Sequence, residues 1–185
     1  VFVTFRLTGL LCLPGATYAI CLIMQKTSGT MSLPGETATM SFGTALAESL
    51  QPGDIILLDG PVGAGKTTLA RALIRALTHP EQDVPSPTFT LVQTYQTGEG
   101  HDLLHYDLYR LEEPEELIEL GWDEVGSDRT IALIEWPNRI GEMPVGNVLH
   151  LQIDTGENNL ERQLYLHGYG DWGNRMDDLL QKLSS

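Results

Sequence analysis

Residues 55–70 read IILLDGPVGAGKTTLA, and this stretch decides the fold. Its first four residues are apolar without alternation, which is typical of a strand covered on both faces in a parallel sheet. Gly60 to Thr67 then matches the P-loop pattern, in which a glycine and four free positions precede Gly-Lys and a Ser or Thr. From Thr67 an apolar stripe of helical period runs until Pro80. Strand, glycine loop and helix in this order predict an α/β fold of the P-loop NTPase type.

The residue types of this loop suit the binding of phosphates. Glycines let successive backbone N–H groups turn inward, which makes a concave anion site at the start of a helix. Lys66 supplies a mobile positive charge for the β- and γ-phosphates, and the Thr67 hydroxyl can ligate Mg²⁺. A plain glycine-rich turn would not explain Lys and Thr at these two places. We therefore expect ATP as substrate, Mg²⁺ as cofactor, and a nucleotide site formed by Gly60, Gly63, Ala64, Gly65, Lys66, Thr67 and Thr68.

The rest of the body predicts one domain over residues 31–185, a three-layer fold with a mixed central sheet and antiparallel hairpins. Alternating apolar residues on either side of a turn-rich segment predict a hairpin of strands 89–95 and 103–109. A second strand pair is expected at 148–153 and 163–166. The other expected elements are a buried strand over 131–134 and helices over 42–50, 114–120 and 176–183.

Two acids are candidates to complete the phosphate site. A strand period of two places His105, Asp107 and Tyr109 on one face, so Asp107 is either a site carboxylate or part of a solvated strand face. Glu135 follows four apolar residues, as acids do at the carboxyl end of a parallel strand, where α/β ligand sites form. It ligates the metal through water, orients the attacking water, or is only an ion-paired or capping acid. Trp136 beside it is either a core residue or a base-stacking platform.

The segment Ser86-Pro87-Thr88 lies between the P-loop helix and the expected hairpin. Pro85 and Pro87 stiffen it, so Ser86 and Thr88 are either hydroxyls presented to the γ-phosphate or Mg²⁺, like a switch segment, or parts of a simple proline turn. Arg110 and Arg139 are candidate charge stabilisers, and the sequence does not distinguish them from surface arginines.

The charge balance argues against direct binding of nucleic acid. With 25 acidic and 11 basic residues, the formal net charge is −14, whereas nucleic-acid affinity depends mostly on Lys and Arg. A protein this acidic is better suited to docking on a basic protein partner. The body of the chain has no cysteine, because Cys12 and Cys21 both lie near the N-terminus. A reducing, cytoplasmic location fits that usage.

Residues 1–30 form an unusual N-terminal stretch. Val1 to Met24 is apolar and could pass for a weak signal or anchor, but Pro14 and Gly15 divide it into pieces too short to span a bilayer of about 30 Å as helix. We expect no membrane association. We expect instead a non-native or disordered extension that arises from an upstream start assignment, with Met24, Met31 or Met40 as the true beginning. Intact mass of the native protein would test this.

Several motifs together resemble the bacterial TsaE (YjeE) family in order and spacing. They are Gly63–Thr68, Ser86–Thr90, His105–Leu111, Leu120-Gly121 with Glu124, and Ile134–Arg139. The resemblance implies a cytoplasmic Mg²⁺-dependent ATPase that supports the TsaD and TsaB proteins when threonylcarbamoyl is installed on adenosine beside the anticodon of tRNA. Contact with tRNA would then be indirect, through the complex. The family normally starts near Met31, which agrees with a misassigned start.

The resemblance also implies roles for individual residues. Lys66 would hold phosphates, Thr67, Asp107 and Glu135 would serve the metal, and these acids with Lys66 would be the catalytic residues. Ser86 and Thr88 would be the switch-like hydroxyls, and Trp136 would be needed for activity or docking. Two positions depart from the family: Asn138 stands where an acid is common, and Pro61 where an acid is frequent. Neither is needed for the phosphate chemistry described above.

Two rival functions remain open at this stage. A small-molecule P-loop kinase would need an acceptor pocket and usually a basic lid, for which 11 basic residues leave little. A nucleotide-gated scaffold would hydrolyse ATP slowly and only time its release from a partner. Stimulation of phosphate release by TsaD and TsaB would favour the partnered ATPase, whereas phosphorylation of a metabolite would favour the kinase.

Overall fold

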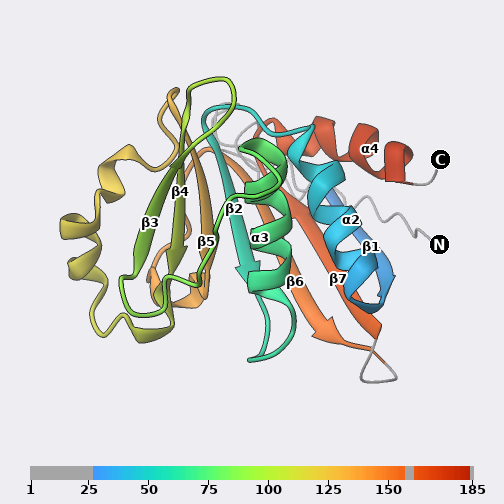
Figure 1. Cartoon of the computed structure of the whole chain (residues 1–185), viewed down its shortest axis with the longest axis horizontal. Helices are drawn as coiled ribbons and strands as arrows, with labels where there is room; N and C mark the ends of the chain where they lie inside the picture. Colours follow the sequence, from blue (N-terminus) through green and yellow to red (C-terminus); the bar gives the residue numbers. More distant parts are fainter. Residues whose placement is uncertain (1–26, 157–160, 184–185) are drawn as a thin grey trace, which may run out of the picture.

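A single seven-stranded mixed sheet organises the chain in the computed structural model, which describes residues 27–156 and 161–183 (Figure 1). The strand order is β1-β7-β6-β2-β5-β4-β3. The strands are β1 Thr27–Pro34, β2 Asp54–Asp59, β3 Val92–Gln96, β4 Asp102–Asp107, β5 Thr130–Glu135, β6 Asn147–Thr155 and β7 Glu161–Gly168. Strands β6, β2, β5 and β4 run parallel, and antiparallel strands flank them on both sides.

Both faces of the sheet are covered. The helices α2 Gly35–Ala47, α3 Lys66–Leu77 and α4 Trp172–Leu183 pack on one face, where Phe42, Leu73 and Trp172 belong to one apolar core (Figure 1). The other face carries a second core, covered by the 3-10 helices η2 Pro114–Leu120, η3 Trp122–Glu124 and η4 Pro137–Arg139. The predicted three-layer α/β fold with a mixed sheet and two antiparallel hairpins is confirmed.

The buried centre of the sheet follows from its apolar sequence. All six residues of β5 and five of the six in β2 are buried, which explains why neither strand alternates in the sequence. Strand β2 leads directly into the glycine loop, and α3 returns over the sheet. The architecture thus places the start of α3 at the edge where β2, β4 and β5 end.

The first hairpin differs from its predicted bounds. Strand β3 begins at Val92 instead of Phe89, because Leu91 adopts a left-handed backbone with φ of 62° and its N–H is bonded to the Pro87 carbonyl. Strand β4 ends at Asp107, whose carboxylate accepts the Tyr109 N–H and begins the 3-10 turn η1 Leu108–Arg110. Tyr109 therefore does not continue the strand face of His105 and Asp107, contrary to prediction.

The N-terminal strand β1 was not predicted. It pairs with β7 along its whole length, from Thr27 opposite Gly168 to Pro34 opposite Glu161. The residues 27–30, which the sequence assigned to the extension, therefore belong to the sheet. The remainder of that extension, residues 1–26, lies outside the described residues, and its interpretation stays a prediction. Within residues 27–156 and 161–183, no helix is both long enough and apolar enough to cross a membrane.

Candidate functional site

The predicted acids meet the glycine loop at one edge of the sheet. Asp107 is the last residue of β4 and Glu135 the last of β5, and the two are register partners across these parallel strands. Glu135 also lies opposite Leu58 of β2, the strand that continues into the loop. The carboxyl ends of three neighbouring strands thus bring together the predicted site residues, as expected for α/β ligand sites.

Glycines shape the loop where side chains would not fit. Gly65 caps α3 in the left-handed region, with φ of 107°. Gly60 has φ of 138°, and a Cβ there would lie 2.2 Å from the Ile153 carbonyl oxygen of β6. The loop therefore packs directly on β6 at its start and opens toward the N-terminus of α3 at its end. A helix N-terminus of this kind attracts anions through its free N–H groups and its dipole.

Lys66 folds back over the loop and is only 4% exposed. Its Nζ donates to the carbonyl oxygens of Gly60 at 2.7 Å and Pro61 at 2.9 Å, and it lies 3.7 Å from the centre of the Trp136 ring. Burial lowers the pKa of Lys66 below its usual 10.5, while the charges of Glu135, Asp107 and Asp59 oppose that shift. The ammonium donates to two neutral carbonyl oxygens, and a bound phosphate would give it a direct anionic partner, which would offset the cost of burying its charge.

Glu135 links the loop to strand β4. It is 1% exposed, and its Oε2 accepts the Thr67 hydroxyl at 3.0 Å. Its Oε1 lies 3.0 Å from Nε2 of His105, which is fully buried. Within the described part of the chain, His105 Nδ1 has no hydrogen-bond partner. Both oxygens of this carboxylate are therefore oriented by side chains, as an acid that positions a ligand must be.

Asp107 holds the predicted switch-like hydroxyls. Its Oδ2 accepts from Ser86 Oγ at 3.0 Å and from Thr88 Oγ1 at 2.5 Å, and its Oδ1 accepts the Tyr109 N–H at 3.1 Å. The carboxylate is 3% exposed. The solvated-face alternative for Asp107 is wrong, because three hydrogen bonds and burial fix this side chain. The segment 86–88 is likewise tied to the site and is more than a proline turn.

These residues line one cavity of about 420 Å³. Its lining consists of Val62, Gly63, Gly65, Lys66, Thr67, Thr68, Ser86, Thr88, Asp107, Tyr109, Glu135 and Trp136. Trp136 adopts a left-handed backbone with φ of 62°, and its ring lies 4.9 Å from that of Tyr109. Arg110 and Arg139 are not among the lining residues; Arg110 stacks on the exposed Phe89. The cavity is thus lined by the glycine loop and the start of α3, two acids, the hydroxyls of Ser86 and Thr88, and two aromatic rings.

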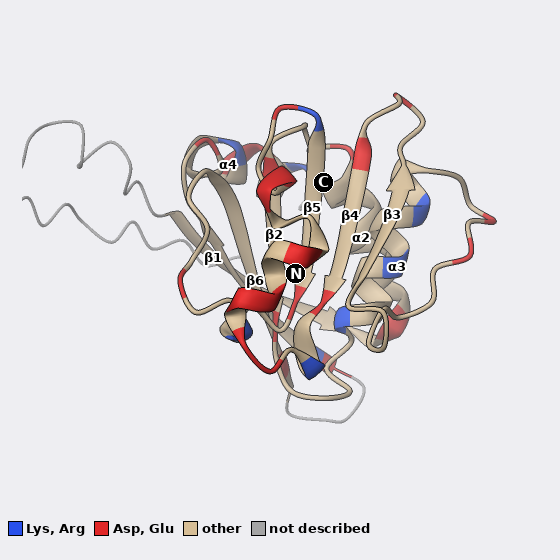
Figure 2. Cartoon of the chain, turned by 90° about the vertical axis from the view of Figure 1, so that its left-hand side faces the viewer, with Lys and Arg blue, Asp and Glu red and all other residues tan. Residues whose placement is uncertain are grey.

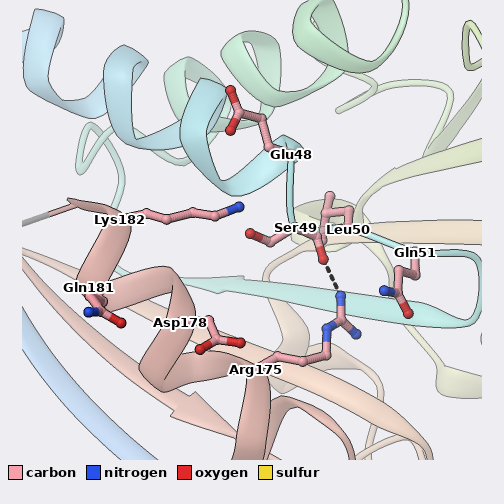
Figure 3. A pocket seen from close by; sticks show the side chains of 8 residues that line it. All are labelled: Glu48, Ser49, Leu50, Gln51, Arg175, Asp178, Gln181 and Lys182. Atoms are coloured by element: carbon pink, nitrogen blue, oxygen red, sulfur yellow. Dashed lines mark hydrogen bonds between the residues drawn. The ribbon is translucent and has the colours of Figure 1, made fainter. Parts of the chain in front are cut away.

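A second cavity, of about 550 Å³, lies between the end of α2 and α4 (Figure 3). Arg175 lines it and donates to the Ser49 carbonyl oxygen, drawn dashed in Figure 3, and to both oxygens of Asp54 at 2.8 Å. Asp54 is fully buried and begins β2, whereas the glycine loop follows the other end of that strand. This cavity is therefore separate from the candidate site, and its arginine ties α4 to β2.

Two further residues near the site were not assigned a role from the sequence. His105 shares the face of Asp107, so alternation along β4 was a usable signal. Arg162 of β7 donates from Nε to the Ala64 carbonyl oxygen at 2.8 Å. It stands 98 positions from that partner, and no local motif marks it. Only the pairing of β7 with β6 brings Arg162 to the loop.

The side chains at the site are suited to magnesium. A hydroxyl and two carboxylates, from Thr67, Glu135 and Asp107, line the cavity together, and Mg²⁺ prefers such hard oxygen ligands. Magnesium bound with phosphates usually takes only one or two carboxylates and keeps several waters. Within the described residues, no group of three His, Cys, Asp or Glu side chains could hold a metal ion by itself. The donors present fit an ion that arrives with a nucleotide.

Comparison with known proteins gives a consistent result. The family described as "Threonylcarbamoyl adenosine biosynthesis protein TsaE" matches residues 33–164. The protein named "tRNA threonylcarbamoyladenosine biosynthesis protein TsaE" of Rickettsia conorii is 39% identical over 128 residues, which cover 69% of this chain and 72% of that protein. Its namesake in Nostoc sp. is 40% identical over 134 residues, 70% and 82% of the two chains. The crystal structure of Bacillus subtilis YdiB matches with a TM-score of 0.65 and 26% identity, covering 86% of this chain and 95% of that one.

Proposed function

The chain belongs to the TsaE family, and from this premise we propose that it is a Mg²⁺-dependent ATPase that supports TsaD and TsaB in threonylcarbamoyladenosine modification of tRNA. The names of the family and of its relatives place them in that biosynthesis. Hydrolysis of ATP, dependence on Mg²⁺ and the two partners are the parts that this proposal adds.

One observation carries the proposal. At the start of α3, the hydroxyl of Thr67 donates to the carboxylate of Glu135. The buried side chains of Lys66 and Asp107 line the same cavity. A glycine turn that served only the fold would not need to gather these charges around a cavity of about 420 Å³. Hydrogen-bond donors lower the cost of burying the two carboxylates, but among the described residues that line the cavity Lys66 is the only cation, so the arrangement favours a ligand that brings a further cation.

Each group has a distinct part in the proposed reaction. The loop N–H groups and the Lys66 ammonium bind the β- and γ-phosphates and stabilise negative charge on them. Thr67 and the acids Asp107 and Glu135 hold Mg²⁺, directly or through water; when bound, the ion neutralises charge on the phosphates. Ser86 and Thr88, fixed by Asp107, offer hydroxyls to the γ-phosphate end of the site.

The attacking water needs an acceptor that stays in place. Glu135 is suited to this role as well, because His105 and Thr67 fix both of its oxygens. Trp136 packs against Tyr109 and over the Lys66 ammonium, and restricted access of bulk water there would strengthen each charge interaction. Positioning and charge stabilisation of this kind make up most of phosphoryl-transfer catalysis.

The surface charge supports a basic protein partner. Acidic residues colour much of the ribbon on the side of the molecule that faces the viewer in Figure 2. The 3-10 helices η2 and η3 alone carry Glu115, Glu116, Asp123 and Glu124. A field of this sign favours encounter with a basic protein surface and disfavours direct contact with tRNA. TsaD and TsaB are the partners proposed on family grounds, and tRNA would be reached through them.

Phosphate release from ATP tests the proposal. The purified protein would be assayed with Mg²⁺, alone and with TsaD and TsaB, beside a Lys66→Ala variant as the matched inactive control. We expect release that needs Mg²⁺, rises with the partners and disappears in the variant. Equal release by the variant would contradict the assigned site, and phosphate transfer to a metabolite would favour a kinase instead. Release that the partners leave slow and unchanged would favour the nucleotide-gated scaffold.

Depletion of the protein in its own cells tests the cellular role. Mass spectrometry of tRNA nucleosides should then reveal less threonylcarbamoyladenosine, and restoring the wild-type chain, but not Lys66→Ala, should return it. An unchanged level of the modified nucleoside would remove the proposed place in this pathway while leaving the ATPase proposal intact.

A further inference from the structure

The phosphate loop contacts β6 and β7, two strands that pair antiparallel with each other. Gly60 lies so close to β6 that a Cβ would collide with the Ile153 carbonyl oxygen. Farther along the loop, Arg162 of β7 binds Ala64. The Arg162 guanidinium donates from Nε to the Ala64 oxygen at 2.8 Å and from Nη2 to the Gly63 oxygen at 3.3 Å. Two consecutive carbonyls of the loop are therefore bound by one side chain.

These bonds bear on the amides that would meet phosphate. A trans peptide is planar, and its N–H points opposite to its C=O. When Arg162 binds the Ala64 carbonyl, the N–H of Gly65 in the same peptide unit is directed away from Arg162. Gly65 has φ of 107°, and glycine has the most backbone freedom of any residue. Without Arg162, the backbone at Gly65 would therefore do little to fix the direction of this N–H.

Arg162 is itself well anchored. It lies near the start of β7, the middle one of three strands, and is paired with Leu33 of β1 on one side and with Thr155 of β6 on the other. Its Nη1 also donates to the Glu161 carbonyl oxygen at 3.0 Å. A planar guanidinium with several donors can hold two acceptors in a fixed arrangement, which a lysine ammonium on a flexible stem cannot.

We propose that Arg162 is a positioning residue for the nucleotide site: it binds the Gly63 and Ala64 carbonyls and so fixes the shape of the loop. Through the Ala64 carbonyl it directs the Gly65 N–H toward the cavity that Gly65 lines, where phosphate would bind, whereas the Ala64 N–H is already bonded to the Pro61 oxygen. This inference rests on the proposed nucleotide binding. It assigns β7, and the strands β1 and β6 that pair with it, a part in phosphate recognition, although the P-loop sequence pattern includes no residue of these strands.

Two measurements on Arg162→Ala, Arg162→Lys and Arg129→Ala test this. Arg129 is a suitable control because its side chain is 76% exposed and its removal changes the net charge equally. The first measurement is calorimetric titration with ADP and with ATP. We expect Arg162→Ala to weaken both nucleotides about tenfold or more, as the loss of bonds from a charged donor predicts. Arg162→Lys should recover only part of that loss, and Arg129→Ala should bind like wild type.

The second measurement is amide hydrogen exchange of the peptide covering residues 60–67, without nucleotide. Exchange there should be faster in Arg162→Ala, while the buried part of α3 stays protected. If Arg162→Ala does not fold, Arg162→Lys is compared in the same way. Wild-type affinity together with wild-type exchange in the folded variant would overturn the inference. If the wild-type protein bound no nucleotide, the proposed function would fail, and loop exchange would still decide the role of Arg162.

Discussion

Asp107 and Glu135 stand opposite each other at the ends of neighbouring parallel strands, yet each is bonded to a different segment of the chain. Asp107 binds the hydroxyls of Ser86 and Thr88, whereas Glu135 binds that of Thr67. Both residues are nearly inaccessible, 3% and 1% exposed. The pair therefore joins the start of α3 and the segment before β3 to one edge of the sheet.

The separate bonding of the two acids predicts a specific defect for Asp107→Asn. The substitution preserves size but removes the charge and alters the bonds to Ser86 and Thr88. We expect ATP hydrolysis to fall by about a hundredfold or more, because the lost charge lies in a site shielded from water. ADP affinity without Mg²⁺ should stay close to that of wild type. Asp102→Asn, at the exposed start of the same strand, is the control; near-normal hydrolysis by Asp107→Asn would contradict the assignment.

Two glycines of the loop should respond differently to alanine. At Gly60 a Cβ would collide with backbone, 2.2 Å from the Ile153 oxygen, while at Gly63 it would meet nothing within 4 Å. Both have positive φ. Urea unfolding should therefore reveal a loss of about 1 kcal/mol for Gly63→Ala, from left-handed strain alone, and about 2–3 kcal/mol for Gly60→Ala. Equal losses would show that the contact with β6 does not constrain the loop.

The ion pair between Arg175 and Asp54 should matter for stability and not for nucleotide binding. Asp54 is fully buried, so Arg175→Ala would leave a charge without its main partner. We expect the free energy of unfolding to fall by about 3 kcal/mol. Arg129→Ala, in an exposed pair, should change it by less than about 1 kcal/mol. A loss of nucleotide affinity in folded Arg175→Ala would link the second cavity to the site.

Tyr106 predicts how stability depends on alkaline pH. Burial, and then the charge of Asp123, raise its pKa to about 12 from the usual 10.0, and its hydroxyl donates to the Leu120 oxygen. Between these values the unfolded chain loses the tyrosine proton while the folded chain keeps it. Stability from this group is therefore full below pH 10 and declines as the pH rises toward 12.

Tyr106→Phe should lose about 1 kcal/mol at neutral pH, from the missing hydrogen bond. Its stability should also fall less steeply than that of wild type over the alkaline range. Ultraviolet absorbance of tyrosinate, followed during titration of both proteins, measures the group directly. Ionisation of Tyr106 in the folded protein near the ordinary pKa would contradict this account.

The parts of the fold with strong local signals were predictable from sequence. Strands β2 and β5 are apolar because both faces are buried, and the glycine loop has a fixed pattern. Strand β1 was not predicted because its sequence, TSGTMSLP, has only two large apolar side chains, Met31 and Leu33, before its final proline. The strand forms because it pairs along its whole length with β7, which lies far away in the sequence.

The candidate site also contains residues that the sequence predicts and features that it does not. Lys66, Asp107 and Glu135 could be found because each ends a strand or stands in a motif, and the structure brings them together, although their roles stay predictions. The left-handed backbone at Leu91 and Trp136 could not be read from sequence, since neither residue type favours it. Arg162 was missed because its partners are carbonyl oxygens, which leave no trace in residue identity.

The most direct test of the account is calorimetric titration of ATP into the purified wild-type protein and Lys66→Ala, with and without Mg²⁺. We predict saturable binding of one ATP per wild-type chain, tighter with Mg²⁺, and no detectable binding by the variant. Absence of binding by the wild-type protein, or equal binding by Lys66→Ala, would contradict the central claim that the start of α3 is a triphosphate site.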